Sequence, residues 1–492
     1  MKKMILYQSH ICIEGYLLGD SSVLEESLIT RDQYGNVTNV YYDYDPNYER
    51  LYIPRGMDVD RLIDELGIPV EINREYTRPA RMVLTPNITL RNGLQTCGVA
   101  FLLGKDRFQY TTQYSQVSLN LPPGEGKTAI TITALTYMKV KPLIIIHRTN
   151  IAQQWIESFL KFTNINESEI LVIRGSDKLK KAILDDKYKK YKVFLLSHGT
   201  IKSYCSKYGW NSLQNLCDQL GIGVKVIDEA HSNFENTLHI DYYTNVRKTI
   251  YLTATLNRSD WKENRVLNNA FSKVPKFGKN KTSAPERHIV YTGVFYDSRP
   301  SSIDIANSKN YYGFNKIKFA EYCEHSEIFY DTLIKTMDMI VNNEGKKLIL
   351  LSKITTIDET VNRLREYYPS LNIYPYHSKV NMDLYEMAEK ADIIVSTTSS
   401  MKEGIDIHGL RYTLMCEAYS SAVQAEQASG RLRPYAPDPS KKCYYIELVD
   451  KGFPAVYNMY KKRLKIFKNK CYKLINIDRK STRLNSSHPL DL

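Results

Sequence analysis

The stretch SLNLPPGEGKTAITI, residues 118–132, constrains the fold more than any other part of the chain. It predicts a buried strand, a tight loop and a helix, in that order. Gly124 and Gly126 let the backbone approach a phosphate closely, and the helix N-terminus attracts the anion. Lys127 would supply a cation for the β- and γ-phosphates, and Thr128 a hydroxyl for Mg²⁺. The stretch therefore predicts a phosphate-binding loop.

The loop alone leaves an alternative open, because Leu121 stands where the full G-x-x-x-x-G-K-T pattern has its first Gly. A plain Gly turn between a strand and a helix would look similar. The stretch VKVIDEAH, residues 224–231, favours the phosphate loop, since it predicts an apolar strand ending in two carboxylates. Such a pair is costly to bury unless a metal or a proton transfer uses it. We expect Asp228 to hold Mg²⁺, directly or through water, and Glu229 to orient and deprotonate the attacking water.

These motifs, together with TIYLTAT and QAEQASGRLRP further along, follow the order found in superfamily 2 helicases and translocases of the DEAH-box type. The chain resembles that family from about residue 90 to residue 434. The form LNLPPGEGKT and the segment YIPRGMDVD, residues 52–60, are most similar to phage branch-migration helicases and the poxvirus transcript-release helicase. The resemblance implies an α/β fold with two tandem RecA-like parallel-sheet domains. It also implies an ATP and Mg²⁺ site formed between the two sheets.

Composition narrows the class of partner and compartment. The 492 residues carry a net charge of +13, which favours a polyanionic partner, although a basic protein without one would show the same charge. The eight cysteines form no CxxC pair, which indicates a reduced, intracellular chain. No apolar run approaches the roughly 18 residues of a membrane span. We expect a monomeric cytoplasmic motor, in the host cytoplasm if phage-encoded, that acts on DNA rather than RNA.

The pattern along the chain predicts five regions. Near-continuous apolar strands alternate with helical segments in two of them, as in parallel sheets covered on both faces. The predicted regions are a small N-terminal α+β accessory domain (1–80), a first RecA-like domain (81–285), a linker (286–320), a second RecA-like domain (321–475) and a disordered tail or cloning scar (476–492).

The resemblance assigns further roles residue by residue. Gln95 would read the adenine edge, with a plain surface Gln as the alternative. The nucleotide would bind at Gln95, Gly124, Glu125, Gly126, Lys127, Thr128 and Asp406. Nucleic-acid contact and coupling to hydrolysis would involve Arg148, Thr200, His231, Thr253, Thr255, Thr397, Thr398 and Gly404. Ordinary polar loops would also explain several of these positions.

The segment SAVQAEQASGRLRP is similar to the arginine-finger segment of the family. Gln424, Gln427 and Arg431 are spaced i, i+3, i+7, so a helix would place them on one face. Arg431 would then stabilise charge on the γ-phosphate, and Gln427 would help to position the water. Arg433 precedes a Pro and stands one place before the family's second Arg. The helix is expected to end near residue 432, which would let Arg433 turn back toward the nucleotide.

Three functions remain open from the sequence. We expect an ATP-dependent DNA helicase or translocase. An RNA-directed DEAH-type helicase would carry the same motifs. A nucleic-acid clamp that binds ATP without hydrolysing it is a third possibility, against which Lys127 and Glu229 argue.

Overall fold

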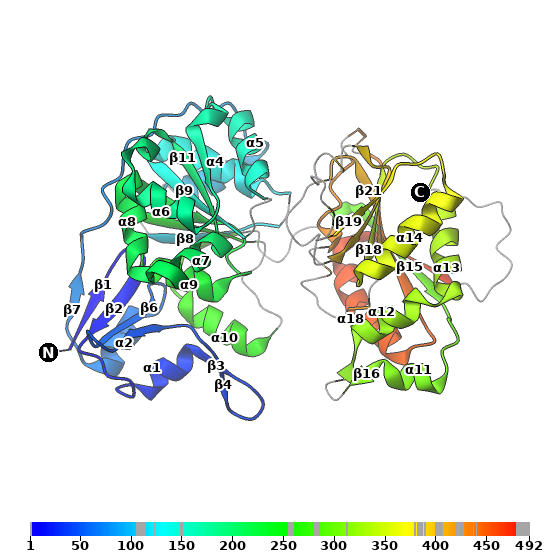
Figure 1. Ribbon diagram of the computed structural model, residues 1–492, viewed down its shortest axis with the longest axis horizontal. Helices are drawn as coiled ribbons and strands as arrows, with labels where there is room; N and C mark the ends of the chain where they lie inside the picture. The colour runs from blue at the N-terminus through cyan, green and yellow to red at the C-terminus, as the bar shows by residue number, and fades with distance from the viewer. Residues whose placement is uncertain are drawn as a thin grey trace. The chain divides into compact units, whose positions relative to one another are not determined.

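The computed structural model divides into two compact units, Met1–Asn280 and Lys281–Leu492 (Figure 1). It describes residues 2–104, 115–122, 124–147, 151–253, 260–278, 286–310, 313–377, 380, 387, 390–398, 407–416, 418–419, 425, 428–435, 437–438 and 440–478. In this part of the chain, no helix has the length and apolar character needed to cross a membrane.

The first unit is built on a seven-stranded, all-parallel sheet with the order β10-β11-β9-β12-β13-β8-β14. Its strands are β8 (Gln116–Asn120), β9 (Lys141–Ile146), β10 (Ile170–Ile173), β11 (Val193–Ser197), β12 (Ile222–Ile227), β13 (Lys248–Thr253) and β14 (Lys276–Gly278). Its α-helices are α3 (Gly93–Leu102), α4 (Lys127–Met138), α5 (Ile151–Phe162), α6 (Ser176–Leu184), α7 (His198–Tyr208), α8 (Leu213–Leu220), α9 (Phe234–Tyr242) and α10 (Trp261–Ala270). Short 3₁₀ helices cover Glu167–Glu169, Asp186–Lys190 and Trp210–Ser212.

Both faces of this sheet are buried, as the continuous apolar strands predict. Successive residues of β9 enter two different core clusters, with Leu143 and Ile145 in one and Ile144 and Ile146 in the other. Alternate side chains of a strand point to opposite faces, so the two clusters lie on opposite sides of the sheet. Both faces are therefore covered by other elements.

A smaller five-stranded sheet, with the order β5-β6-β2-β1-β7, precedes the parallel sheet. Its strands are β1 (Lys3–Leu6), β2 (His10–Glu14), β5 (Asp43–Asp45), β6 (Arg50–Pro54) and β7 (Val70–Ile72). A two-stranded sheet of β3 (Ile29–Arg31) and β4 (Val37–Val40) lies beside helix α1 (Ser22–Ser27) in the chain. Helix α2 (Val59–Leu66) begins after Asp58, whose side chain accepts from the Arg61 N–H, and ends at Gly67 with φ of 62°. These caps fix both ends of the helix.

The small sheet shares a core with the first unit. Met4 and Ile11 of the small sheet belong to the same buried cluster as Leu143 and Phe194 of the parallel sheet. The N-terminal region is therefore packed onto one face of the parallel sheet and belongs to the same compact unit.

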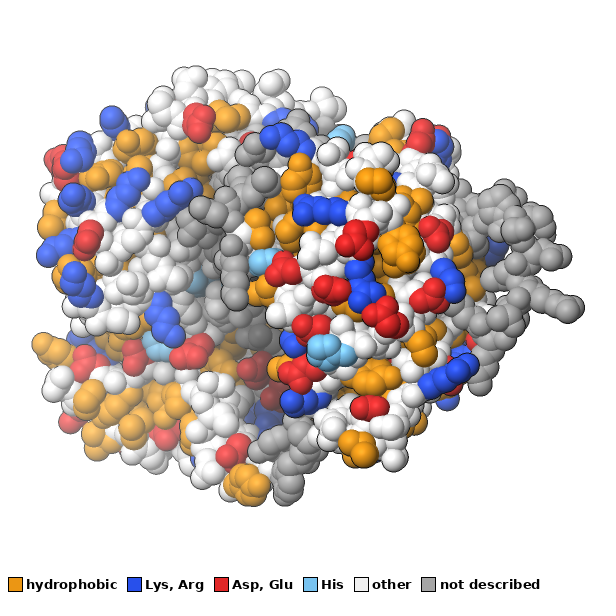
Figure 2. All heavy atoms as spheres, turned by 45° about the vertical axis from the view of Figure 1, so that its right-hand side comes forward, with side chains coloured by type: hydrophobic (Ala, Val, Ile, Leu, Met, Phe, Trp, Pro, Cys, Tyr) orange, Lys and Arg blue, Asp and Glu red, His pale blue; other side chains and the backbone are white. Residues whose placement is uncertain are grey.

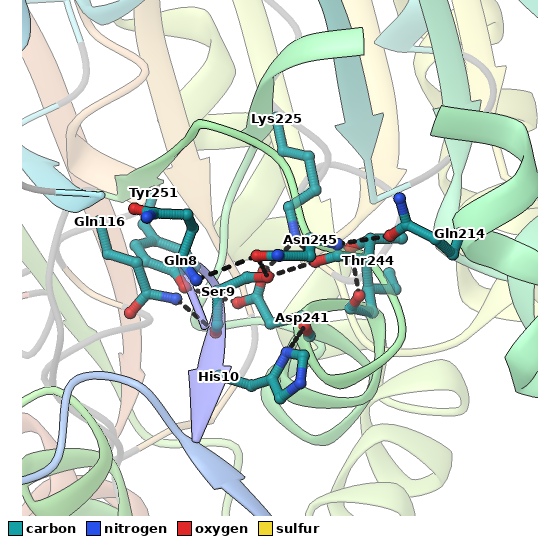
Figure 3. A network of polar contacts seen from close by, with 11 residues as sticks. Gln8, Ser9, His10, Gln116, Gln214, Lys225, Asp241, Thr244, Asn245 and Tyr251 are labelled. Atoms are coloured by element: carbon teal, nitrogen blue, oxygen red, sulfur yellow. Dashed lines mark hydrogen bonds and ion pairs between the residues drawn. The ribbon is translucent and has the colours of Figure 1, made fainter. Parts of the chain in front are cut away.

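A buried polar network also joins the two sheets (Figure 3). Lys225 of β12 is fully buried and lies 2.5 Å from the Asp241 carboxylate of α9. The β1–β2 turn reaches this pair, since His10 Nδ1 lies 3.1 Å from the Asp241 carbonyl oxygen and Ser9 Oγ donates to the Thr244 carbonyl. Because unpaired groups would be costly at such depth, the network fixes the turn against the parallel sheet.

The second unit repeats the topology of the first. Its parallel sheet has the order β19-β20-β18-β21-β22-β15-β23. The strands are β15 (Glu286–Tyr296), β18 (Lys346–Leu351), β19 (Ile373–Tyr376), β20 (Ile393–Thr397), β21 (Leu410–Met415), β22 (Cys443–Asp450) and β23 (Cys471–Asp478). The helices are α11 (Ser302–Asn307), α12 (Lys316–Glu324), α13 (Glu327–Asp338), α14 (Ile354–Tyr367) and α18 (Pro454–Lys470), and β16 (Lys309–Asn310) pairs with β17 (Gly313–Phe314). The two parallel sheets and the N-terminal sheet confirm the predicted tandem RecA-like α/β fold.

The sequence predicts a linker over residues 286–320, and the structure corrects this for its first part. Residues Glu286–Tyr296 form β15, which lies between β22 and β23. Ile289 pairs with Cys443 in the parallel register with β22, so the contacts that define the strand come from far later in the chain. The flanking basic segment obscured this strand in the local pattern. The last strand, β23, likewise extends to Asp478, inside the region predicted as a tail.

Acidic and basic side chains intermingle on the face of the molecule shown in Figure 2. Ion pairs on the helices of the second unit join Lys318 to Glu321, Lys335 to Asp331, and Arg363 to Glu327. Exposed pairs of this kind contribute little to stability. The net positive charge is thus not gathered into one uniform basic surface on that face.

Candidate active site

The phosphate loop has the backbone that its two glycines predict. Gly124 and Gly126 both have φ of 87°, a left-handed conformation that costs other residues energy. A Cβ built on Gly126 would lie 2.3 Å from Gln95 Nε2, so a side chain here would have to displace the end of Gln95. Gly126 is the N-cap of α4, so the loop leads directly into the helix N-terminus. A negative ligand would be favoured at this terminus.

Two residues of the preceding segment hold this loop. Arg91 Nη2 donates to the Gly124 carbonyl at 2.7 Å, and Gln95 Nε2 donates to the Glu125 carbonyl at 3.2 Å. Gln95 is only 1% exposed, and its side-chain oxygen accepts from the Arg91 N–H at 2.8 Å. Gln95 is therefore a buried support of the loop, and the plain surface alternative is wrong. Its proposed contact with adenine stays a prediction.

The Lys127 side chain lies along the loop in the structure. Its Nζ donates to the Leu121 carbonyl at 2.8 Å. Leu121 itself is fully buried, so the residue that replaces the first Gly of the pattern serves the core. Thr128 follows in the first turn of α4 and is partly exposed. The predicted cation and hydroxyl therefore both stand at the helix N-terminus.

Asp228 follows β12 directly and is held on two sides. Its Oδ2 accepts from Trp155 Nε1–H at 3.0 Å, and its Oδ1 accepts from the Glu229 N–H at 3.0 Å. Burial raises the pKa of Asp228 to about 6, the Glu229 charge adds to the rise, and Trp155 and Lys127 oppose it. A carboxylate whose charged form is disfavoured in this way is suited to a cation. Asp228 and the Thr128 hydroxyl thus fit Mg²⁺, which prefers oxygen ligands.

Glu229 has an unusual backbone conformation. Its φ is 48°, which is uncommon outside Gly and costs of order 1–3 kcal/mol. The turn is closed by the Ser232 N–H, which donates to the Glu229 carbonyl at 2.7 Å. Such strain is found most often at functional sites, and here it fixes the direction of the predicted base.

His231 connects Glu229 to the next strand. Its Nδ1 lies 2.8 Å from Thr253 Oγ1 and 3.3 Å from Glu229 Oε2. Both His231 and Thr253 are buried. The Thr253 carbonyl accepts from the Leu121 N–H at 3.2 Å, at the entrance to the phosphate loop. Thr253 thus contacts both the loop and His231, which lies beside Glu229, and its coupling role stays a prediction.

The loops after β9 and β11 contact the segment that follows the acid pair. Asn233 Nδ2 lies 2.8 Å from His147 Nδ1, and Asn236 Nδ2 lies 2.8 Å from His198 Nδ1. Thr200, a predicted nucleic-acid contact, is buried, and its Oγ1 lies 3.0 Å from Ser197 Oγ in the cap of α7.

Several predicted residues of the second unit are also described. Thr397 ends β20 and is buried, and Thr398 follows it. Arg431 lies in a turn after the helical residue Ser429, so the helix ends earlier than the predicted residue 432. Its predicted alignment with Gln424 and Gln427 stays a prediction, because those two residues lie outside the described part of the chain. Predicted residues outside the described part of the chain are Arg148, Thr255, Gly404, Asp406, Gln424 and Gln427.

The chain is similar in sequence to a family model and to viral proteins. Residues 91–258 match the family model described as the type III restriction enzyme res subunit. The transcript termination protein A18 of Yaba monkey tumor virus is 23% identical over 338 residues, which cover 65% of this chain and 65% of the length of that relative. The viral match bears out the predicted similarity to the poxvirus transcript-release protein.

Two solved structures also match the chain. The crystal structure of T4 UvsW, 14% identical, covers 97% of this chain and 99% of its own, with a TM-score of 0.38. The crystal structure of the Pyrococcus furiosus Hef helicase domain, also 14% identical, covers 76% of this chain and 100% of its own, with a TM-score of 0.45.

Proposed function

We propose that the protein is an ATP-dependent nucleic-acid helicase or translocase that couples hydrolysis to movement along one strand, with DNA as its substrate. One observation carries the proposal. The phosphate loop and the acid pair lie at the same edge of one parallel sheet and are joined through His231 and Thr253. The carboxyl ends of parallel strands are where ligands bind in such sheets. The relationship to superfamily 2 helicases supports the same conclusion.

In this proposal the loop binds the nucleotide. Gly124 to Thr128 surround the phosphates, and Gln95 and Arg91 keep the loop in place. Lys127 would exchange its bond with the Leu121 carbonyl for the phosphate oxygens. Mg²⁺, held by Thr128 and Asp228, would neutralise charge that develops on the transferred phosphoryl group.

Glu229 would then accept a proton from the attacking water. Its turn is fixed by the Ser232 contact and its carboxylate lies within reach of His231, so the base is oriented before the substrate binds. Arg431, Arg433 and Gln427 remain the predicted groups that stabilise the γ-phosphate and position the water. A clamp that binds ATP without turnover would have no use for the strained Glu229 turn.

Different observations favour DNA and RNA as the substrate. The resemblance of LNLPPGEGKT to phage branch-migration helicases favours DNA. The name of the viral relative, a transcript termination protein, favours a role on transcripts as the second candidate. The net charge of +13 suits either polymer.

The deciding experiment measures ATP hydrolysis in the presence of single-stranded DNA, forked DNA, branched DNA or RNA. The polymers have matched lengths, and the salt concentration is the same throughout. We expect DNA to raise the rate at least tenfold above the rate with RNA. Equal or greater stimulation by RNA would replace the DNA-directed proposal with the RNA-directed one. Affinities for each polymer should be measured at two salt concentrations, because phosphate contacts make binding strongly salt-dependent.

A further inference from the structure

Helix α18 differs in charge from the neighbouring helices that the structure describes in the second unit (Figure 1). Between Asp450 and Asp478 the sequence has seven lysines and one arginine, and it has no acidic residue. Helices α12, α13 and α14 instead mix both signs and form ion pairs, such as Lys335 with Asp331. A basic segment of this length is therefore not the ordinary surface of this unit.

The structure sorts the side chains of α18 onto two faces. Val456, Tyr460 and Phe467 are at most 3% exposed and belong to the hydrophobic core of the second unit. The opposite face carries four exposed lysines, which we call the α18 basic surface: Lys461, Lys462, Lys465 and Lys468. At about 100° per residue, these four lie within roughly 120° of one another around the helix axis. They therefore form one continuous stripe.

The arginine of the helix does not belong to this surface. Arg463 is 2% exposed, and its Nε lies 3.0 Å from Glu447 Oε1. Lys451, at the other end of the basic segment, pairs with Asp478. Within the described part of the chain, the four lysines of the α18 basic surface enter no ion pair. Their charge is therefore available to a ligand.

Gathering these lysines on one face works against the helix itself. Lys461 and Lys465 are four residues apart, and Lys465 and Lys468 are three apart, so their like charges repel across adjacent turns. The negative end of the helix attracts cations only in the last turn, which Lys461 and Lys465 do not reach. A carboxylate at one of these positions would relieve the repulsion. A polyanionic partner explains the uniform charge better than helix stability does.

The form of the surface favours a duplex over a single strand. Proteins that bind single strands usually combine cations with exposed aromatic rings on which the bases stack. The ring of Tyr457 is covered by Lys461, whose Nζ lies 4.4 Å from its centroid, and it packs edge-on against Phe295. Among the described residues of α18, no aromatic ring is thus open to a base. Cations alone suit the phosphates of a duplex, whose bases are already stacked.

Two other possibilities fit less well. The exposed ring of Tyr472 follows Cys471, which belongs to the same core cluster as Phe467. Because alternate side chains of a strand point to opposite faces, Tyr472 points away from α18. An anionic membrane would need the apolar face of the helix, and that face is buried in the core.

The α18 basic surface also lies apart from the predicted strand contacts. Thr397 ends β20 and so stands at the carboxyl edge of the sheet. Helix α18 begins at Pro454, shortly after β22 ends at that edge, and leads back to the start of β23. Lys468 is about 20 Å along the helix from Pro454, toward the opposite edge. The two sets of residues would therefore contact different parts of a nucleic acid.

We propose that the α18 basic surface binds the phosphate backbone of duplex nucleic acid, such as the paired arm of a fork or branch. The inference rests on the proposed function for the identity of the polyanion, but it does not depend on ATP turnover. Contacts of this kind add affinity and hold the duplex in place without reading its sequence. The substrate would then be a junction of single and double strands.

The test measures binding by the full chain without nucleotide, to a blunt DNA duplex, to a single strand of the same length and to a fork. The variant removes the four charges together: Lys461→Gln, Lys462→Gln, Lys465→Gln and Lys468→Gln. We expect affinity for the duplex and the fork to fall about tenfold or more, and affinity for the single strand to fall less than about twofold. The slope of log affinity against log salt concentration should become shallower by about 3 to 4 for the duplex, because each phosphate contact contributes about 0.9.

The matched control removes the same total charge from four separate elements. It changes exposed lysines outside α18: Lys161→Gln, Lys181→Gln, Lys190→Gln and Lys309→Gln. Its affinity for the duplex should stay within about threefold of that of the unchanged chain. An equal loss in both variants would show that only the total charge matters, and would overturn the inference.

Folding is checked by thermal unfolding, which should be similar in the variant and the unchanged chain because Gln and Lys have similar helix propensities. If the fourfold variant unfolds early, Lys465→Gln with Lys468→Gln replaces it and should change the salt slope by about half as much. Unchanged duplex affinity and slope in a folded variant would overturn the inference and leave the surface to an acidic protein. Absence of ATP hydrolysis by the unchanged chain, measured alongside, would overturn the proposed motor and leave the binding result standing.

Discussion

The two parallel sheets share one topology and differ in the residues that come directly after their strands. Numbered along the chain within each unit, the described strands of both sheets have the order 3-4-2-5-6-1-7. In the first unit, the first strand leads into the glycine loop and the fifth into Asp228 and Glu229. In the second, the first strand leads into Asp297 and the fifth into buried Cys416.

The sixth strand of each sheet shows that equivalent positions make different contacts in the two units. Thr253 at the end of β13 contacts the loop after β8 through its carbonyl, which leaves its hydroxyl for His231. Asp450 at the end of β22 accepts from the Ser298 N–H in the loop after β15 at 3.2 Å, and from the Gly452 N–H in the loop after β22 at 2.9 Å. The loops after β15 and β22 are therefore both held by hydrogen bonds to the Asp450 carboxylate. Topology sets where a site can form, and the residues at the strand ends decide whether one does.

Among the described residues, a buried ion pair lies on the sheet of each unit, and breaking these pairs should have the largest effect on stability. Lys225 pairs with Asp241 in the first unit, and Glu447 pairs with Arg463 at 3.0 Å in the second. Lys225→Met or Glu447→Leu should each lower the free energy of unfolding by about 3–5 kcal/mol, because the partner charge is left buried and unpaired. Denaturant unfolding measures this.

Replacing both members of a pair by apolar residues is the matched control. The variant Lys225→Met with Asp241→Leu should recover much of the loss, since no charge then remains unpaired. A single substitution that costs less than about 1 kcal/mol in either unit would contradict the account of these pairs.

The pH dependence should distinguish the first unit through His10. Burial lowers the pKa of His10 to about 3, against about 6.5 in an unfolded chain. Between these values the unfolded state binds the extra proton, so this stabilisation is complete above about pH 6.5 and is lost as pH falls toward 3. From pH 7 to pH 4 the free energy of unfolding should fall by about 3 kcal/mol from this residue.

The variant His10→Asn tests that assignment. Its free energy of unfolding should depend less steeply on pH over the same window, with the difference close to one proton. Equal slopes for the two proteins would show that His10 is not the group responsible.

The two units should also respond differently to alanine at glycines with positive φ. Gly126→Ala would push a Cβ against Gln95 and should weaken nucleotide binding about a hundredfold, through strain and displacement of the loop. Gly409→Ala, with φ of 78° and no atom within 4 Å of the added Cβ, should cost only about 1 kcal/mol of stability. Fluorescent nucleotide titration and thermal unfolding measure these. Unchanged affinity in Gly126→Ala would remove the loop from the nucleotide site.

The smallest expected effect concerns Trp155. Trp155→Phe keeps most of the packing and removes the N–H that donates to Asp228 at 3.0 Å. A hydrogen bond to a charged group is worth about 1.5–3 kcal/mol, so hydrolysis at saturating ATP should fall about tenfold. Trp210→Phe, at a partly buried site in the same unit, is the control. A parallel fall in both variants would point to general destabilisation.

The sequence predicted the parts of the site that depend on local motifs better than the parts that depend on distant residues. The glycine loop, the strand before Asp228 and the buried α/β alternation follow from nearby residues and are present as expected. The residues that support the site cannot be identified from the local sequence. Trp155 and Arg91 contact the site from other elements, and Asn233 contacts His147, which follows β9. Strand β15 was not predicted for the same reason, because both of its neighbouring strands come much later in the sequence.

The central claim is that the first sheet hydrolyses ATP and that nucleic acid stimulates the reaction. The most direct test measures ATP hydrolysis by the full chain and by Glu229→Gln, with and without DNA and RNA, alongside nucleotide affinity. The account predicts strong stimulation in the unchanged chain, at least a hundredfold loss in Glu229→Gln, and ATP binding that is retained by the variant. ATP binding without turnover under any condition would contradict the motor and leave the nucleic-acid clamp.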